Sequence, residues 1–147
     1  MSNIAAAPAP FKLGDQDFLM SPLTDRDIQE VNNFIKQDIL TAAREGCKNE
    51  TNIIIVQAMM KAAMEQASKV DWIMDSTLLQ TIDRLTYLIW IGTRNNNPKM
   101  TRVSFAKLFM EDWEKNIDIC MEALQNVNPS LLRKKMEQKA TEEQERF

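Results

Sequence analysis

Apolar positions in the first third of the chain follow the period of an α-helix. They recur on one helix face at Ile28, Val31, Ile35, Ile39 and Ala42. Thr24 precedes this run and Asp27 lies three residues later, a spacing typical of a capping box at a helix start. Gly46 follows the run, where glycine commonly ends a helix. The pattern therefore predicts a first helix between Thr24 and Gly46.

A second helix is predicted from near Asn49 into the 70s. Its first half reads IIIVQAMMKAAM and is apolar on nearly every side. Because a helix that is hydrophobic all round is typically buried, we expect this one at the centre of the core. Its methionines, Met59, Met60 and Met64, are interpreted mainly as core residues that fill gaps, with a groove for protein partners as the alternative.

The rest of the chain is divided by capping and turn signals. Thr77-x-x-Gln80 has the form of a capping box and predicts a third helix that ends near Gly92. Residues 94–98 read RNNNP, which predicts a loop. Thr101 then opens a helical stretch, and one helix or two across 102–126 stays open. Asn128-Pro129 is typical of a further helix start.

Fold class and domain organisation follow from these elements. Residues 1–10 are rich in alanine and proline and predict a disordered, flexible arm. The segment FKLGDQDFLMSP has a turn at Gly14-Asp15 between apolar runs and predicts a small β-hairpin. We therefore expect an all-α domain of four to five helices with this hairpin over 11–127, and a charged C-terminal helix or tail over 128–147.

Composition excludes many kinds of enzyme. The chain has 147 residues, the size of one domain, and contains no histidine, which removes Ser-His-Asp, Cys-His and HExxH chemistry. Its three glycines are too far apart for a phosphate-binding loop, and Cys47 and Cys120 form no CxxC pair. Asp71 and Asp75 are interpreted as solvated or capping acids. We expect no catalytic residue, cofactor or metal, and no membrane span or targeting segment.

Charge is separated along the second half of the chain. Residues 94–107 contain four basic and no acidic side chains, whereas residues 111–122 contain five acids and one lysine. The basic segment is either a solvated loop or a docking patch for an acidic partner or a phosphate backbone. The candidate residues of such a patch are Arg94, Lys99 and Arg102, which are also the residues that a DNA-binding hypothesis would require. Trp90 is a core candidate that could also anchor an interface. The net charge of −3 and the long loop after Arg94 argue against a helix-turn-helix DNA reader.

Two stretches resemble the tail assembly chaperones of tailed bacteriophages. The first is LTYLIWI over 85–91, followed by the basic Arg94, an Asn-rich turn, Pro98 and Thr101 at a helix start. The second is FKLGDQDFLMSPLTDRDI over 11–28, which is similar to that family's opening hairpin and helix start. The loop here reads Asn-Asn-Asn-Pro where the family often has a histidine.

The resemblance implies a non-enzymatic assembly factor that binds the tape-measure and tail-tube proteins in the cytoplasm of the host cell. It also implies a longer product made by ribosomal frameshifting, and self-association stays open. Alternative hypotheses are a structural protein of the virion neck or tail, and a small DNA-binding regulator. An enzyme ranks last. A Met-rich helical domain fits the first hypothesis because flexible side chains can repack around different helices.

Overall fold

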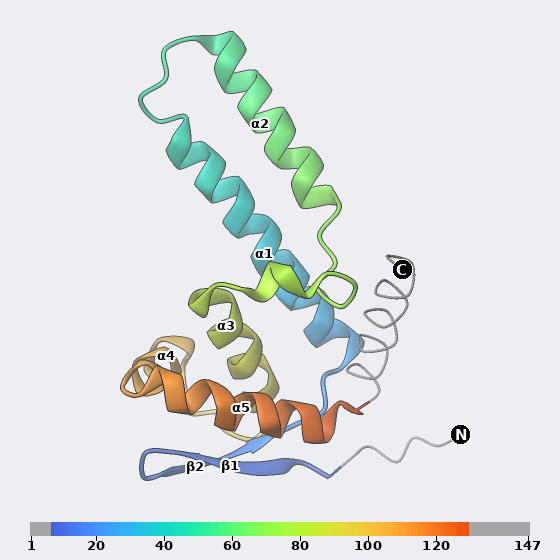
Figure 1. The fold of residues 1–147 in the computed structure, drawn as a ribbon, viewed down its shortest axis with the longest axis vertical. Helices are drawn as coiled ribbons and strands as arrows, with labels where there is room; N and C mark the ends of the chain where they lie inside the picture. The colour runs from blue at the N-terminus through green and yellow to red at the C-terminus, as the bar shows by residue number, and fades with distance from the viewer. Residues whose placement is uncertain (1–6, 130–147) are drawn as a thin grey trace, which may run out of the picture.

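The protein is described by a computed structural model over residues 7–129, which is mostly helical with a small N-terminal hairpin (Figure 1). In chain order the elements are β1 Ala9–Leu13, β2 Gln16–Met20, α1 Asp25–Gly46, α2 Ile53–Ser68, the 3-10 helix η1 Ser76–Leu79, α3 Ile82–Thr93, α4 Arg102–Met110 and α5 Trp113–Val127. The predicted fold class is confirmed at this level. The predicted tail over 128–147 and the first six residues of the arm lie almost wholly outside the described residues.

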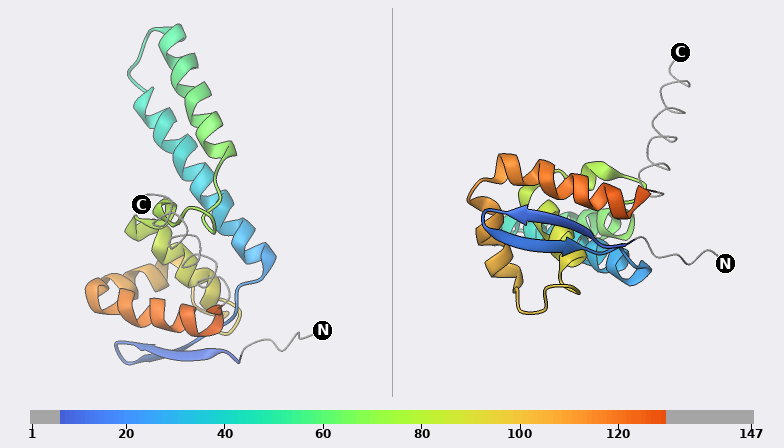
Figure 2. Two further views of the ribbon diagram at one scale, coloured as in Figure 1. Left: turned by 45° about the vertical axis from the view of Figure 1, so that its right-hand side comes forward. Right: turned by 90° about the horizontal axis from the view of Figure 1, so that it is seen from below.

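The N-terminal hairpin forms one side of the body of the molecule. β1 pairs antiparallel with β2, with Phe11 opposite Phe18, and the chain reverses at Gly14, whose φ of 59° glycine adopts without strain. Alternate residues of the strands are buried: Phe11, Leu13, Phe18 and Met20. α5 runs across this hairpin (Figure 2). Because β1 begins at Ala9, the hairpin starts two residues inside the range predicted as a disordered arm.

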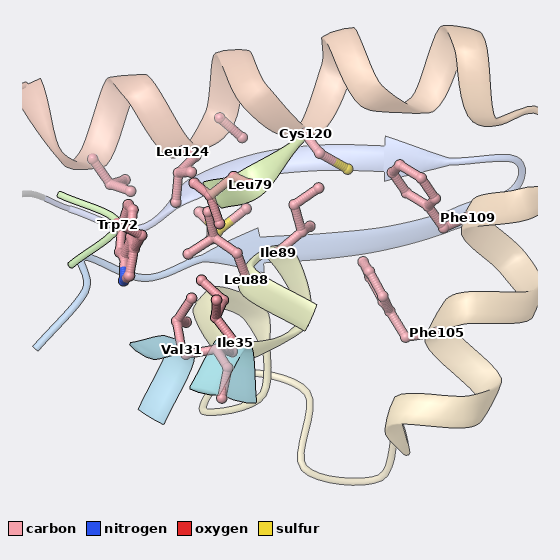
Figure 3. Close-up of a cluster of buried hydrophobic side chains, with 14 of the residues drawn as sticks. Val31, Ile35, Trp72, Leu79, Leu88, Ile89, Phe105, Phe109, Cys120 and Leu124 are labelled. Carbon is pink, nitrogen blue, oxygen red and sulfur yellow. The ribbon is translucent and has the colours of Figure 1, made fainter. Parts of the chain in front are cut away.

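The core lies between the hairpin, α3, α5 and the first half of α1 (Figure 3). It includes Phe105 and Phe109 from α4 and Cys120 from α5, all almost fully buried. Trp72 is also buried, and its indole N–H donates to the Ile28 carbonyl at 3.1 Å. The Trp72 ring is therefore part of the core.

The start of α1 is the predicted capping box. The Asp27 amide donates to the Thr24 hydroxyl at 3.1 Å, and the Thr24 amide donates to the Asp27 carboxylate at 3.0 Å. The helix ends at Gly46, as predicted, but without a left-handed glycine. Cys47 follows in a right-handed conformation and donates its amide to the Ala43 carbonyl, so the last turn is closed by ordinary helical bonds.

The prediction of the second helix as the centre of the core is wrong. α2 begins at Ile53, where the Asn52 side chain accepts from the Ile54 amide, and it packs antiparallel against the far half of α1 (Figure 1). The two helices form a hairpin that projects from the body. α1 can cover only one side of α2, the side that carries the buried Ala63 and Ala67. Met59 and Met64 are exposed.

The predicted capping box at Thr77 is also wrong. Asp75 accepts a hydrogen bond from the Thr77 amide at 3.1 Å, which starts the short helix η1 instead. α3 begins later, at Ile82, because the Thr81 hydroxyl accepts from the Arg84 amide at 3.2 Å. Threonine at two positions offered the same capping chemistry, and the position directly before the apolar run forms the cap.

Residues 102–127 form two helices, with the break that the sequence left open. Thr101 caps α4 through the Ser104 amide, as predicted, and α4 ends at Met110. Asn116 on α5 donates its side-chain amide to the Phe109 carbonyl at 2.9 Å, which holds the corner between the helices. Asn128 follows α5 and donates its side-chain amide to the Leu124 carbonyl, so it closes this helix. Pro129 after it is helical, in line with the predicted helix start, and the rest of such a helix lies outside the described residues.

Candidate protein-binding surface

The largest group of exposed apolar side chains lies on α2. The exposed apolar side chains of α2 lie around the sides of the helix that α1 does not cover, and we call them together the α2 apolar face: Ile53, Ile54, Ile55, Met59 and Met64. Ile54 is 76% exposed, Ile53 70% and Met64 62%. Single exposed apolar residues are normal in proteins, but a group of this kind on one helix marks a binding surface.

The α2 apolar face is built by the hairpin of α1 and α2. Ala63 and Ala67 are the buried residues of α2, and their small side chains allow close approach of the two helices. The isoleucines lie in the first turn of α2, at the tip of the hairpin, where α1 has already ended at Gly46 (Figure 1). No other element of the described chain reaches this tip in Figure 1 or in the left view of Figure 2. The isoleucines are therefore exposed because the hairpin of α1 and α2 projects from the body.

The methionine side chains of this face are flexible and polarisable. Met59 lies beside Cys47, with 3.8 Å between the two sulfur atoms, and Met64 lies further along the helix. Methionine side chains have three rotatable bonds and a polarisable sulfur, which lets one surface fit several partner helices. Lys61 and Glu65 on the same helix provide one charge of each sign. The face can hold an amphipathic helix mainly by apolar contact.

Arg94, a predicted binding residue, is held by ion pairs within the chain. Its guanidinium lies 2.7 Å from Glu30 and 3.1 Å from the buried Asp27, both on α1. The hydrogen bond to Arg94 holds the pKa of Glu30 below its usual value, and the same bond raises the pKa of Arg94. The structure thus places Arg94 as a link between α3 and α1 that is only partly exposed.

Trp90 and Arg102 belong to a row of stacked side chains between α1, α3 and α4. Phe34 stacks on Tyr87 with 4.0 Å between ring centroids, and Trp90 lies next to Tyr87 at 5.9 Å. The Arg102 guanidinium lies 4.6 Å from the Phe34 centroid, and the Arg94 guanidinium 5.7 Å from that of Trp90. Burial raises the pKa of Tyr87. Trp90 is half-buried, so it is neither a fully buried core residue nor a free anchor.

Lys99 is an exposed residue, as is Arg102, but unlike Arg94 and Arg102 it lies apart from the stacked row. It lies in the loop between α3 and α4 and takes part in no ion pair among residues 7–129. With Phe18, Pro98 and Met100 it lines a shallow depression of about 470 Å³ beside the hairpin. The structure therefore brings Trp90, Arg94 and Arg102 together in one row and places Lys99 apart from them.

Groups capable of chemistry are few in the described part of the chain. No group of three or more His, Cys, Asp and Glu side chains there could hold a metal ion. Burial raises the pKa of Cys120 to about 12, and Asp71 and Asp75 are exposed, as predicted. No described helix is long and apolar enough to cross a membrane. No match was found among protein-family models, curated proteins or solved structures.

Sequence reasoning missed Ile53, Ile54 and Ile55 as binding residues. Apolar residues on all sides of a helix indicate that it needs cover on all sides, but they do not tell whether the cover comes from the same chain. The available signal was the loop sequence from Cys47 to Asn52 before the helix. It is short enough to return α2 along α1, which leaves the rest of α2 without a partner.

Proposed function

We propose that this protein is a non-enzymatic binding protein that holds α-helices of other proteins on the α2 apolar face. The observation that carries the proposal is the exposure of Ile53, Ile54 and Met64 on a helix that projects from the body. A partner helix would remove these side chains from water, at about 25 cal/mol per Å² of apolar surface buried.

Within this class, we propose a tail assembly chaperone that binds the tape-measure and tail-tube proteins. The motifs that resemble this family support the proposal through their local structure. One motif forms the hairpin and the Thr24 capping box, and the other forms α3, an Asn-rich loop and the Thr101 cap of α4. A long amphipathic tape-measure helix has the apolar stripe that the α2 apolar face requires.

Binding to nucleic acid is less well supported by the basic segment. Affinity for a phosphate backbone depends on basic side chains that are free to neutralise it. Arg94 pairs with two acids, and Arg102 lies 3.5 Å from Asp83. Two of the three basic residues considered for DNA binding are therefore already engaged within the chain.

Mass spectrometry of what co-purifies with the protein from its native source tests the chaperone proposal. We expect a long helical tape-measure protein as the main partner, and absence of this protein from purified virions. Stoichiometric presence in virions would instead favour a structural protein of the neck or tail. Turnover of a small molecule by the purified protein would contradict the non-enzymatic assignment.

A matched pair of variants tests whether the α2 apolar face does the binding. Ile54→Ser should reduce co-purification of the partner, because it removes the most exposed apolar side chain of this face. Met74→Ser is the control, since Met74 is 60% exposed but lies in the turn between α2 and η1. Equal capture by both variants would show that the partner binds elsewhere.

A further inference from the structure

A second apolar surface lies between α3 and α4, away from α2. It is a shallow groove of about 510 Å³, which we call the α4 groove, lined by Asp83, Thr86, Arg102, Val103, Ala106, Lys107 and Met110. Val103 and Met110 are 64% and 46% exposed. The groove therefore combines exposed apolar side chains with a charged rim.

The rim of the α4 groove is positive on the side of α4. Arg102 and Lys107 belong to this helix, which has no acidic residue. Arg102 is held in place by Asp83 and by the Phe34 ring. Lys107 is exposed and has no ion pair with any residue that the structure describes. An occupant of the groove should therefore present apolar and acidic side chains together.

The outer face of α5 presents that combination. Glu114, Asp118 and Glu122 are exposed and follow one another at single-turn spacing, where like charges repel. None of the three has an ion pair within 7–129. Ile117 and Met121 lie partly exposed along the edge of this stripe. We call these five residues the α5 acidic face.

We propose that copies of this chain associate head to tail, with the α5 acidic face of one copy in the α4 groove of the next. The opposite charges of the two surfaces favour this occupant. Although α4 and α5 are neighbours in one chain, no ion pair joins them in the described residues. Their charges therefore remain available to a second copy.

The two surfaces of this contact are different, so the association is heterologous. A contact of this type repeats from copy to copy and produces a ring or an open row. α2 lies at the other end of the molecule from α4 and α5, so the association leaves the α2 apolar face free (Figure 1). Resting on the proposed function, such a row would present many α2 apolar faces along one long partner helix.

Sedimentation velocity of the full chain over a range of protein and salt concentrations tests this inference. We expect concentration-dependent association that weakens as salt is raised, because salt screens exposed charges. Lys107→Glu should weaken it about five- to tenfold, and Asp118→Lys should do the same. Lys48→Glu is the control. It changes the net charge by the same amount as Lys107→Glu, but Lys48 is an exposed residue in the loop between α1 and α2.

The charge-swapped double variant gives the sharpest result. A chain that carries both Lys107→Glu and Asp118→Lys restores one opposite-charge pair across the contact, with its signs reversed, while Arg102, Glu114 and Glu122 keep theirs. It should associate more tightly than either single variant and recover to within about threefold of the wild type. A monomer at all concentrations, unchanged association in Lys107→Glu, or no recovery in the double variant would overturn the inference. Loss of association in Ile54→Ser alone would assign self-association to α2 instead. If the self-association proposal fails but the proposed function holds, Lys107→Glu should still capture the partner protein as well as the wild type does.

Discussion

Alanine in place of glycine should have opposite effects on stability at the two helical glycines. Gly92 is buried in α3 where this helix passes β2, and a Cβ there would overlap the sulfur of Met20, which is fully buried. Alanine favours a helix over glycine by about 1 kcal/mol, but overpacking a core costs about 1–3 kcal/mol. We expect Gly92→Ala to lower the free energy of unfolding by up to about 2 kcal/mol. At Gly46 a Cβ would lie 3.6 Å from the Met59 methyl, an ordinary contact.

Urea denaturation followed by far-UV circular dichroism measures both effects. Gly46→Ala should raise the free energy of unfolding by about 0.5 kcal/mol, because the unfolded chain loses conformational freedom. In a Met20→Ala background the overlap is gone, so Gly92→Ala should there become neutral or stabilising. If Gly92→Ala stabilises the wild type, or still destabilises the Met20→Ala background by the same amount, the proposed contact between α3 and β2 is refuted.

Three further predictions concern the ion pairs and the thiols. Arg94→Ala should lower the free energy of unfolding by about 1–3 kcal/mol, because it leaves the buried Asp27 carboxylate without its ionic partner. Urea denaturation measures this change, and an unchanged midpoint of the urea transition would contradict it. Because Arg94 holds the pKa of Glu30 below its usual value, the pair stabilises the fold fully above the usual pKa of a glutamate, and this stabilisation is lost as pH falls through the lowered pKa. Thermal unfolding of Glu30→Gln should therefore show a weaker loss of stability on acidification than the wild type. A thiol reagent should modify Cys47 in the native protein and Cys120 only after unfolding. The reason is that Cys120 is buried, which raises the pKa of its thiol to about 12. Peptide mapping of the modified protein measures the reaction at each cysteine.

Local signals in the sequence predicted much of the fold. Thr24 and Thr101 cap helices because a hydroxyl accepts a nearby amide hydrogen, an interaction that needs only three or four residues. The hairpin at Gly14 depends on equally local backbone geometry. Where two residues offered the same chemistry, as Thr77 and Thr81 did, the pattern alone did not tell which would form the cap.

Contacts between distant residues account for what the sequence did not predict. The sequence predicts Arg94 as a candidate binding residue for an acidic partner. In the structure Arg94 instead forms an ion pair with Asp27, which lies 67 positions away in the chain. α2 was expected in the core because of its composition, whereas only Ala63 and Ala67 are buried and the rest of the helix extends beyond the body. The sequence shows the charge of Arg94 and the apolar composition of α2. It does not show that Arg94 has an acidic partner within the chain, or that most of α2 has no covering element.

The most direct measurement for the proposed function is the affinity of the purified protein for its co-purified helical partner, determined by isothermal titration calorimetry. We predict that Ile54→Ser weakens this affinity at least tenfold, while Met74→Ser changes it less than twofold and both variants keep the wild-type unfolding midpoint. Equal affinity of Ile54→Ser and the wild-type protein would contradict the assignment of partner binding to α2.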